Sequence, residues 1–160
     1  MGKTDANATL EILLAGQTYT TTADKQGDWS FSVPETLPDG SHILSVTVTD
    51  IAGNVGTFTE KVQVDTVSPN SHATLHIDTD SGVLGDQLTN HTKPILTGTT
   101  KPEAEVTIQF NGQDYPVTAD KTGAWSWQVP TALVDNVYDY HVTVTDLAGN
   151  TSTGSGQFVV

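Results

Sequence analysis

One stretch in the second half of the chain concentrates oxygen-bearing side chains: DTDSGVLGDQLTN, residues 78–90. Asp78, Asp80 and Asp86 lie in it together with the amide of Asn90 and two glycines that let a loop fold back on itself. Carboxylate and amide oxygens are the ligands that Ca²⁺ takes in proteins. We therefore predict a Ca²⁺ site formed by these four residues. The alternative is a solvated acidic loop that begins with a turn.

The spacing of these residues differs from that of an EF-hand. Counted from Asp78 as position 1, the carboxylates fall at positions 1, 3 and 9, the first glycine at position 5 and a threonine at position 12. An EF-hand requires glycine at position 6 and glutamate at position 12. In an extended chain, Asp78 and Asp80 lie on the same side, about 7 Å apart. Unpaired carboxylates this close repel each other, and a cation would remove the repulsion.

Composition narrows the function classes. The chain has 160 residues with 19 acidic and 6 basic side chains, so its formal net charge is −13. This field repels nucleic acids and anionic lipid surfaces and attracts divalent cations. The absence of cysteine excludes disulfides, thiol catalysis and thiolate zinc sites. No apolar run approaches the roughly 18 residues of a spanning helix, so we predict no membrane insertion. Because of the negative charge, we also predict no nucleic-acid partner.

The chain repeats itself. Residues 15–54 match residues 111–150 at an offset of 96 positions, and glycines, a tryptophan, a proline and the ends VTVTDIAGN and VTVTDLAGN coincide. Upstream, KTDANATLEI (3–12) matches KPEAEVTIQF (101–110) when a two-residue insertion at Leu13–Leu14 is allowed. We therefore expect two copies of one module.

The two copies differ in completeness. We place the first copy at residues 1–64 and the second at residues 65–160, with a linker at about 65–72. The second copy has about thirty residues before its shared part, whereas the first has almost nothing before Lys3. The first copy is therefore expected to lack its first strands, and the chain is expected to be a segment of a longer array with any export signal elsewhere.

Period-two alternation of β-branched and polar residues dominates both copies, and turn residues interrupt it every eight to twelve positions. The fold class that this pattern indicates is all-β, with two tandem immunoglobulin-like antiparallel β-sandwiches, the first N-terminally incomplete. Trp125 and Trp127 are two positions apart and are assigned to the core, and Asp24 and Asp120 to tight turns that end in glycine. The seven strands predicted in the second copy span 73–78, 94–99, 105–110, 113–118, 124–129, 138–145 and 155–160.

Four segments together are specific: VTVTDLAGN, TADKTGAWSW, PILTGTTKPEAEVTI and DTDSGVLGDQLTN. In their order and spacing they resemble the bacterial immunoglobulin-like repeats of giant RTX-type, biofilm-associated adhesins, which Gram-negative bacteria export by type I secretion. The resemblance implies an extracellular extender module on the bacterial cell surface, active in adhesion or biofilm formation and stiffened by Ca²⁺ at and near domain junctions. The implied partners are neighbouring repeats of the same chain, and a host or biofilm surface contacted through other domains.

A second Ca²⁺ site is predicted at the junction between the copies. In a sandwich of this topology the loop between the last two strands lies beside the linker. This places Asp146 and Asn150 near Asp65, with Glu103 in another loop at the same end and Asp39 at the facing end of the first copy. The alternative is that the loop is a hairpin turn, which its aspartate caps.

The first copy carries an equivalent of half of this junction site. Asp50 and Asn54 match Asp146 and Asn150 at the same offset. They are therefore expected to face whatever precedes the first copy, and to form an incomplete site.

Two other function classes remain as alternatives. A module that binds a glycan or a host protein would need exposed aromatic residues, and Tyr138 and Tyr140 are the best candidates, although strand packing explains them as well. No ligand-binding residues can be assigned. An enzyme is not expected and no catalytic residues are assigned, because the five histidines are scattered and no nucleophile elbow, P-loop or dinucleotide motif occurs.

Overall fold

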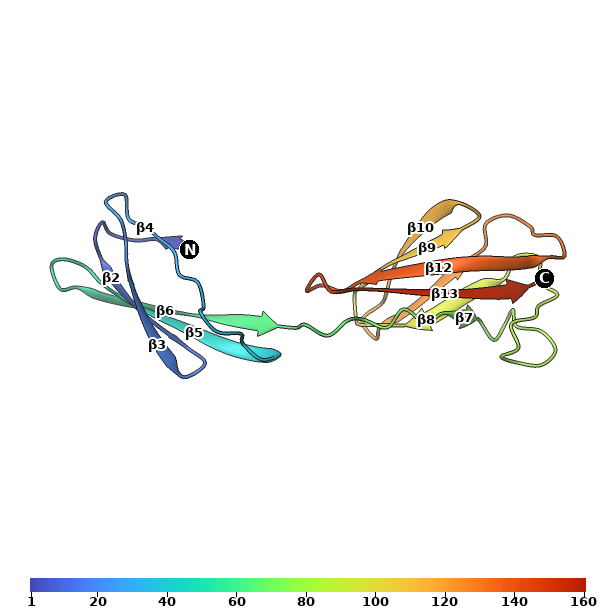
Figure 1. The fold of residues 1–160 in the computed structure, drawn as a ribbon, viewed down its shortest axis with the longest axis horizontal. Helices are drawn as coiled ribbons and strands as arrows, with labels where there is room; N and C mark the ends of the chain where they lie inside the picture. The colour runs from blue at the N-terminus through green and yellow to red at the C-terminus, as the bar shows by residue number, and fades with distance from the viewer. The chain divides into compact units, whose positions relative to one another are not determined.

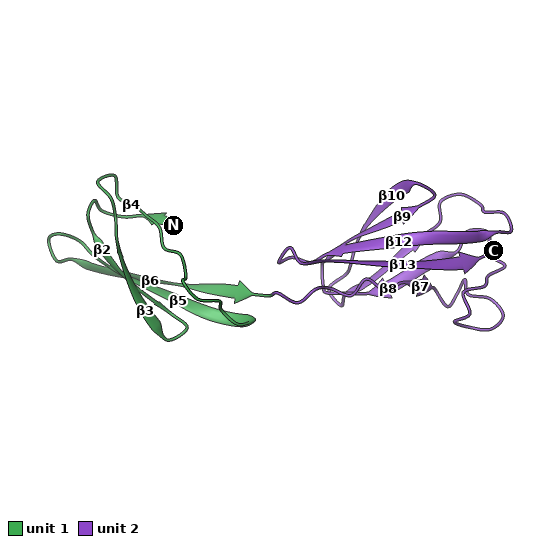
Figure 2. Cartoon of the chain, viewed as in Figure 1, with its two compact units in different colours: residues 1–65 green, residues 66–160 purple.

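The structure is a computed structural model that describes all 160 residues, and its only regular elements are β-strands. The chain divides into two compact units, Met1–Asp65 and Thr66–Val160, called unit 1 and unit 2 here (Figure 2). No helix long and apolar enough to cross a membrane is present. Each unit is an immunoglobulin-like arrangement of antiparallel strands, as the alternating pattern indicated.

Unit 2 contains two sheets that enclose one core (Figure 1). All seven predicted strands are present, and every pairing between them is antiparallel. The four-stranded sheet has the order β10 (Gln113–Thr118), β9 (Glu105–Phe110), β12 (Val137–Thr145) and β13 (Thr151–Val159). The three-stranded sheet has the order β11 (Ala124–Gln128), β8 (Ile95–Thr99) and β7 (Thr74–Leu75).

Alternation along each strand builds the core of unit 2. In β9, Val106, Ile108 and Phe110 are buried, whereas Glu105 and Gln109 face outward. The predicted aromatic pair belongs to this core: Trp125 is buried, and Trp127 packs against the core from its edge. Aromatic rings fill the end of the core near Phe110, where the ring of Phe158 stacks at 5.9 Å.

Two strands differ from their predicted bounds by more than one residue. The strand predicted at 73–78 is only β7, Thr74–Leu75, because the backbone N–H groups of Thr79 and Asp80 both donate to the carbonyl of His76 and form a turn. The last strand begins at Thr151 instead of residue 155, because its pairing with β12 continues to the hairpin turn. Alternation in TLHID therefore does not continue as a strand.

Unit 1 has the same four-stranded sheet but only a small second one. The large sheet has the order β3 (Gln17–Thr22), β2 (Thr9–Leu14), β5 (Gly40–Thr49) and β6 (Val55–Val64). Opposite it, β1 (Gly2–Lys3) pairs only with β4 (Asp28–Trp29). Unit 1 has no counterpart of β7, and β6 is exposed along nearly its whole length. Unit 1 thus has a smaller second sheet than unit 2, and the expectation that its first strands are missing stays a prediction.

The predicted insertion at Leu13–Leu14 is wrong. Both residues lie in the regular ladder of β2, without a bulge. The turn before this strand is closed by a bond from the N–H of Ala8 to the carbonyl of Asp5, and in unit 2 by a bond from Ala104 to Lys101. The offset of 96 therefore holds throughout, and Lys101 corresponds to Asp5.

The ADKQGDW and ADKTGAW segments form equivalent turns. Asp24 Oδ1 accepts bonds from two backbone N–H groups of its turn, and Asp120 Oδ1 does the same in unit 2. Gly27 and Gly123 have φ of +81° and +85°, and a Cβ on either would lie 2.0 Å from a carbonyl oxygen. These aspartates therefore cap turns, which explains why both copies keep Asp and Gly at this spacing.

Candidate functional site

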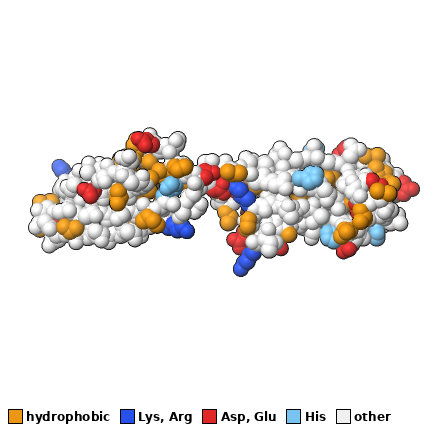
Figure 3. All heavy atoms as spheres, turned by 90° about the horizontal axis from the view of Figure 1, so that it is seen from below, with side chains coloured by type: hydrophobic (Ala, Val, Ile, Leu, Met, Phe, Trp, Pro, Cys, Tyr) orange, Lys and Arg blue, Asp and Glu red, His pale blue; other side chains and the backbone are white.

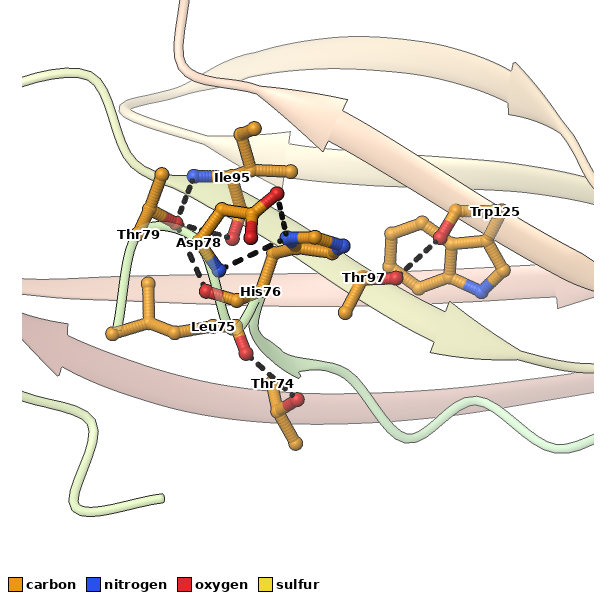
Figure 4. Close-up of polar contacts among 8 residues, drawn as sticks. All are labelled: Thr74, Leu75, His76, Asp78, Thr79, Ile95, Thr97 and Trp125. Atoms are coloured by element: carbon orange, nitrogen blue, oxygen red, sulfur yellow. Dashed lines mark hydrogen bonds and ion pairs between the residues drawn. The ribbon is translucent and has the colours of Figure 1, made fainter. Parts of the chain in front are cut away.

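The acidic loop connects β7 to β8 in unit 2 and begins with the turn at His76 (Figure 4). This turn separates the two aspartates that an extended chain would have placed on one side. The side chain of Asp78 is 79% exposed and lies 3.5 Å from Nδ1 of His76, whereas Asp80 is only 8% exposed. The expected same-side pair of carboxylates therefore does not form.

Asp80 is the one carboxylate that the loop encloses. Its Oδ2 accepts a hydrogen bond from the backbone N–H of Gly85 at 2.6 Å. Its Oδ1 is buried and has no hydrogen-bond partner. A buried, ionised oxygen without a partner is costly, because it loses its hydration and gains nothing in return. A cation at Oδ1 would supply the missing interaction, so this residue fits a metal site.

The other predicted loop ligands lie at the surface. Asp86 Oδ1 accepts the N–H of Leu88 at 2.9 Å, and the N–H of Asn90 donates to Oγ of Ser81 at 2.8 Å. Both Asp86 and Asn90 are exposed. Nowhere in the chain do three or more His, Asp or Glu side chains converge on one point. The structure therefore places the four predicted ligands in one loop without gathering their oxygens.

Two buried threonines, which sequence reasoning missed, hold this loop. Oγ1 of Thr89 donates to the carbonyl of Thr79. Oγ1 of Thr79 accepts the N–H of Ile95 at 3.0 Å (Figure 4). The N–H of Thr89 also donates to the carbonyl of Val159 in the last strand, at 2.9 Å. The loop thus has a fixed base. Threonine in a polar run gives no signal of burial, so only the fold reveals this role.

Acidic and hydrophobic side chains lie together at the end of unit 2 that carries the C terminus (Figure 3). The acidic loop contributes exposed Val83, Leu84 and Leu88 to this end. Val134 and Val137 are exposed beside Asn136, whose backbone pairs with Val160. Carboxylates here are interspersed with apolar groups, so they do not form one continuous charged patch.

At the other end of unit 2, Asp146 is saturated with hydrogen bonds. Its Oδ1 accepts the N–H groups of Ala148 at 3.0 Å and Asn150 at 2.8 Å. Its Oδ2 accepts Nδ2 of Asn150 at 3.0 Å and Nζ of Lys101 at 2.7 Å. Asp146 therefore caps the DLAGN turn, as expected if the loop is a hairpin turn. It also forms an ion pair with Lys101.

Lys101 is a third residue that sequence reasoning missed. Its ammonium donates both to Asp146 and to the backbone carbonyl of Val67. The hydrogen bond from Lys101 is the largest cause that holds the pKa of Asp146 far below its ordinary value, with further bonds from Asn150 acting in the same direction. The sequence did contain a signal for this role. The chain has only 6 basic residues, and one of them, Lys101, lies directly before the PEAE turn.

The predicted junction residues belong to both units. Asp39 and Asp65 lie in unit 1, and Glu103 lies in unit 2 in the turn after Lys101, with φ of +59°. A site shared between these residues and Asp146 stays a prediction.

The equivalent turn of unit 1 also has a capped aspartate. Asp50 accepts the backbone N–H of Asn54 at 2.8 Å and its Nδ2 at 2.7 Å, and these bonds lower the pKa of Asp50. The two turns thus share the Asp–Asn cap, whereas the ion pair belongs to unit 2.

The expectation that Tyr138 and Tyr140 are exposed is wrong for Tyr140. Tyr140 is buried, and its hydroxyl donates to the carbonyl of Ala73 at 2.7 Å. Tyr138 is partly buried against Phe110 and Phe158, and its hydroxyl donates to a backbone carbonyl. Both side chains point toward the core because alternate residues of β12 face inward. They are packing residues and not a binding platform.

A model of the bacterial Ig-like domain matches the chain twice, at residues 1–66 and 67–160. The chain belongs to the bacterial Ig-like domain family. Both units are therefore repeats of this family, which agrees with the resemblance in the sequence.

Solved structures of adhesins and of a large adhesion protein are similar to the chain. One, from a 1.5-MDa bacterial ice-binding adhesin, is 23% identical and covers 99% of this chain and 54% of that chain, with a TM-score of 0.43. A Ca²⁺-stabilized adhesin of an Antarctic bacterium that binds ice is 28% identical over 96% of this chain and 39% of that chain, with a TM-score of 0.39. A tetra-tandem repeat from the extending region of a large adhesion protein is 22% identical over 99% and 43%, with a TM-score of 0.45.

This bacterial Ig-like chain spans about half, or less, of the length of these solved chains. A search of the curated proteins gave no match.

Proposed function

We propose that this chain is an extender segment of a large bacterial surface adhesin, which is exported by type I secretion and acts outside the cell in attachment or biofilm formation. The observation that carries the proposal is the tandem match of both units to one bacterial Ig-like family. Repeated sandwiches joined end to end supply length, and length is what holds a binding domain away from the cell. Its partners are neighbouring repeats, with host or biofilm surfaces contacted through other domains.

We infer that Ca²⁺ stabilises unit 2 at the acidic loop. The buried, unpartnered Oδ1 of Asp80 supports this, because a cation is the partner that an ionised oxygen needs there. Asp78, Asp86 and Asn90 lie in the same loop and would supply further oxygens. The hard oxygen donors of this set suit Ca²⁺ better than a soft transition metal.

We also propose a Ca²⁺ ion between the repeats, with Asp65, Asp39 and Glu103 as its ligands. An ion that also used Asp146 and Asn150 would compete with Lys101, which already occupies Oδ2 of Asp146.

For the first repeat, we propose that Asp50 and Asn54 form an incomplete equivalent of the junction site.

Calcium at such sites would change the mechanics of the array. Repeats joined by short linkers move relative to one another by default, because the contact between them is small. Binding to the folded state alone stabilises it by about 2.7 kcal/mol when free Ca²⁺ exceeds the dissociation constant a hundredfold. Fluids outside cells hold far more free Ca²⁺ than cytoplasm does. The connections between repeats would therefore be flexible before export and rigid afterwards.

Thermal unfolding of the chain in EDTA, Ca²⁺ or Mg²⁺ tests this function. Ca²⁺ is expected to raise the Tm of unit 2 by several degrees, and Mg²⁺ is expected to have little effect because it demands a stricter octahedral geometry. The control variant is Asp139→Asn, which removes an exposed carboxylate from β12 and should keep the full response. Identical melts in all three solutions would refute the calcium proposal and leave the extender proposal to rest on the repeat.

One observation favours the alternative, a module that binds a glycan or a host protein. Unit 2 has a surface hollow of about 350 Å³ whose lining is mostly polar. The matching positions in unit 1 include Leu13 and Ile43, so this hollow is not a general feature of the repeat. Titration of the chain against a glycan panel separates the two functions, because an extender should bind none. The residues that could contact a ligand there are Gln109, Asn111, Asp139 and His141.

A further inference from the structure

The ion pair at the N-terminal end of unit 2 is unusual in its burial. The side chain of Asp146 is 2% exposed and that of Lys101 is 28% exposed. A carboxylate this deeply buried must be compensated by charge and hydrogen bonds, or its desolvation would destabilise the fold. Lys101 supplies the only formal positive charge among the groups bonded to Asp146, since the other donors are amides.

The same ammonium holds the chain where it enters unit 2. Residues 67–73, the leading segment, form no regular strand. Lys101 donates to the carbonyl of Val67, and Oγ of Ser152 donates to the carbonyl of Pro69 at 2.6 Å. Asn70 Nδ2 donates to the carbonyl of Thr99 at 2.9 Å. The leading segment is therefore fastened by side chains, and Lys101 provides its first fastening.

The turn that carries Lys101 does not need a lysine to form, as the equivalent turn of unit 1 shows. Asp5 stands at the equivalent position of unit 1, and the turn there has the same backbone bond, from Ala8 to Asp5 at 3.2 Å, as from Ala104 to Lys101 at 3.3 Å. The turn thus accepts either residue. What differs is the neighbourhood of the capped aspartate: in unit 1, Asp5 and Asp50 line one hollow of about 370 Å³. The backbone does not require lysine, so its role lies in its ammonium group.

We propose that Lys101 is a built-in cation that closes Asp146 to metal ions and fastens the leading segment to the DLAGN turn. Two bonds of one ammonium do this, to Oδ2 of Asp146 and to the carbonyl of Val67. Unit 2 therefore holds its first residues in place without a Ca²⁺ ion on Asp146. The inference goes beyond the proposed function, since it replaces a metal by a side chain at one site.

The surroundings of Asp146 oppose a metal ion there. Apart from Lys101, every group bonded to its oxygens is an N–H donor, from Ala148 and Asn150. Such donors present positive hydrogen atoms toward the carboxylate, whereas Ca²⁺ needs six to eight oxygens around it. An ion at Oδ2 would have to displace the ammonium and would also release Val67. The turn is therefore suited to an ammonium group and poorly suited to Ca²⁺.

The test is an NMR titration of the complete chain with Ca²⁺, combined with backbone order parameters. In the wild type, the amides of Ala148 and Asn150 are expected to stay unshifted while Ca²⁺ is added. In Lys101→Met the order parameter of the Val67 amide should fall from near 0.85 to below about 0.6, the range of a flexible backbone. Lys101→Arg keeps the charge and should retain most of the order. Lys121→Met, at an exposed turn lysine, is the matched control and should change neither.

Three results would overturn the proposal: shifts of Ala148 and Asn150 in the wild type, unchanged order at Val67 in Lys101→Met, or equal loss of order in the Met and Arg variants. The wild-type titration decides even if Lys101→Met does not fold. If Ca²⁺ shifts no amide of residues 78–90 in the wild type, the calcium proposal for the acidic loop is refuted. That result would not affect the proposal for Lys101. The two failures are therefore distinguishable.

Discussion

The backbone N–H of Gly85 donates to Oδ2 of Asp80 at 2.6 Å, inside a loop where Oδ1 of the same carboxylate is buried without a partner. One oxygen of Asp80 is therefore a structural acceptor and the other is available for a ligand. This division lets a single substitution separate the two roles.

Asp80→Asn is expected to remove the response of unit 2 to Ca²⁺ without unfolding the loop. The amide oxygen can still accept from Gly85, while the charge that would bind a cation is lost. At a hundredfold excess of Ca²⁺ over its dissociation constant, the variant should lack about 2.7 kcal/mol of calcium-dependent stability. Urea unfolding in EDTA and in Ca²⁺ measures this difference. An equal loss of stability in both solutions would mean that Asp80 acts only in the fold.

The ion pair between Lys101 and Asp146 should be visible in acid. Because the folded-state pKa of Asp146 is lowered from its ordinary 3.8, its contribution to stability is complete above that value and is lost as the pH falls below it. The stability gap between the wild type and Lys101→Met should thus be largest above pH 3.8 and narrow below it. Urea unfolding across this range measures the gap, with Lys121→Met as control. A gap that does not change with pH would contradict the ion pair.

Tyr140→Phe should destabilise unit 2 by about 1 kcal/mol, because the carbonyl of Ala73 loses a buried hydrogen bond. Tyr138→Phe is the matched control, since its hydroxyl donates to the carbonyl of Val134 at the exposed rim of the sandwich. Its expected effect is close to zero. Equal effects in the two variants would show that the leading segment does not depend on Tyr140. Chemical denaturation followed by tryptophan fluorescence is the measurement.

Gly154→Ala should destabilise unit 2 by about 1–3 kcal/mol, the cost of overpacking. A Cβ at this position would lie 2.5 Å from the backbone oxygen of Ser71 in the leading segment. Gly56→Ala in β6 is the control, because a Cβ there meets nothing within 4 Å. That substitution should be neutral or slightly stabilising in unit 1. If both variants behave alike in thermal melts, the leading segment does not press against β13.

The sequence was informative where local periodicity determines structure. Val106, Ile108 and Phe110 alternate with polar residues, and this alternation alone places β9 in a half-buried sheet. The same signal misled at TLHID, because the turn at His76 depends on hydrogen bonds that alternation does not report. Asp78 and Asp80 consequently face different environments.

Contacts between distant residues could not be read from the sequence. Lys101 and Asp146 are 45 positions apart, and their ion pair exists only because two loops meet at the same end of unit 2. Thr79 and Thr89 are buried only because the loop between them folds back onto Val159. The sequence therefore indicated which loops carry carboxylates, but not which carboxylates already have partners.

The leading segment and β13 run side by side in the same direction, since Ser152 meets Pro69 and Gly154 meets Ser71. A pulling force on unit 2 enters through the leading segment and leaves through the end of β13, near Val160. The bonds between them would then be loaded in shear, so that they must break together and not one after another. In an array of such repeats, this arrangement would let each repeat resist a pulling force applied along the array.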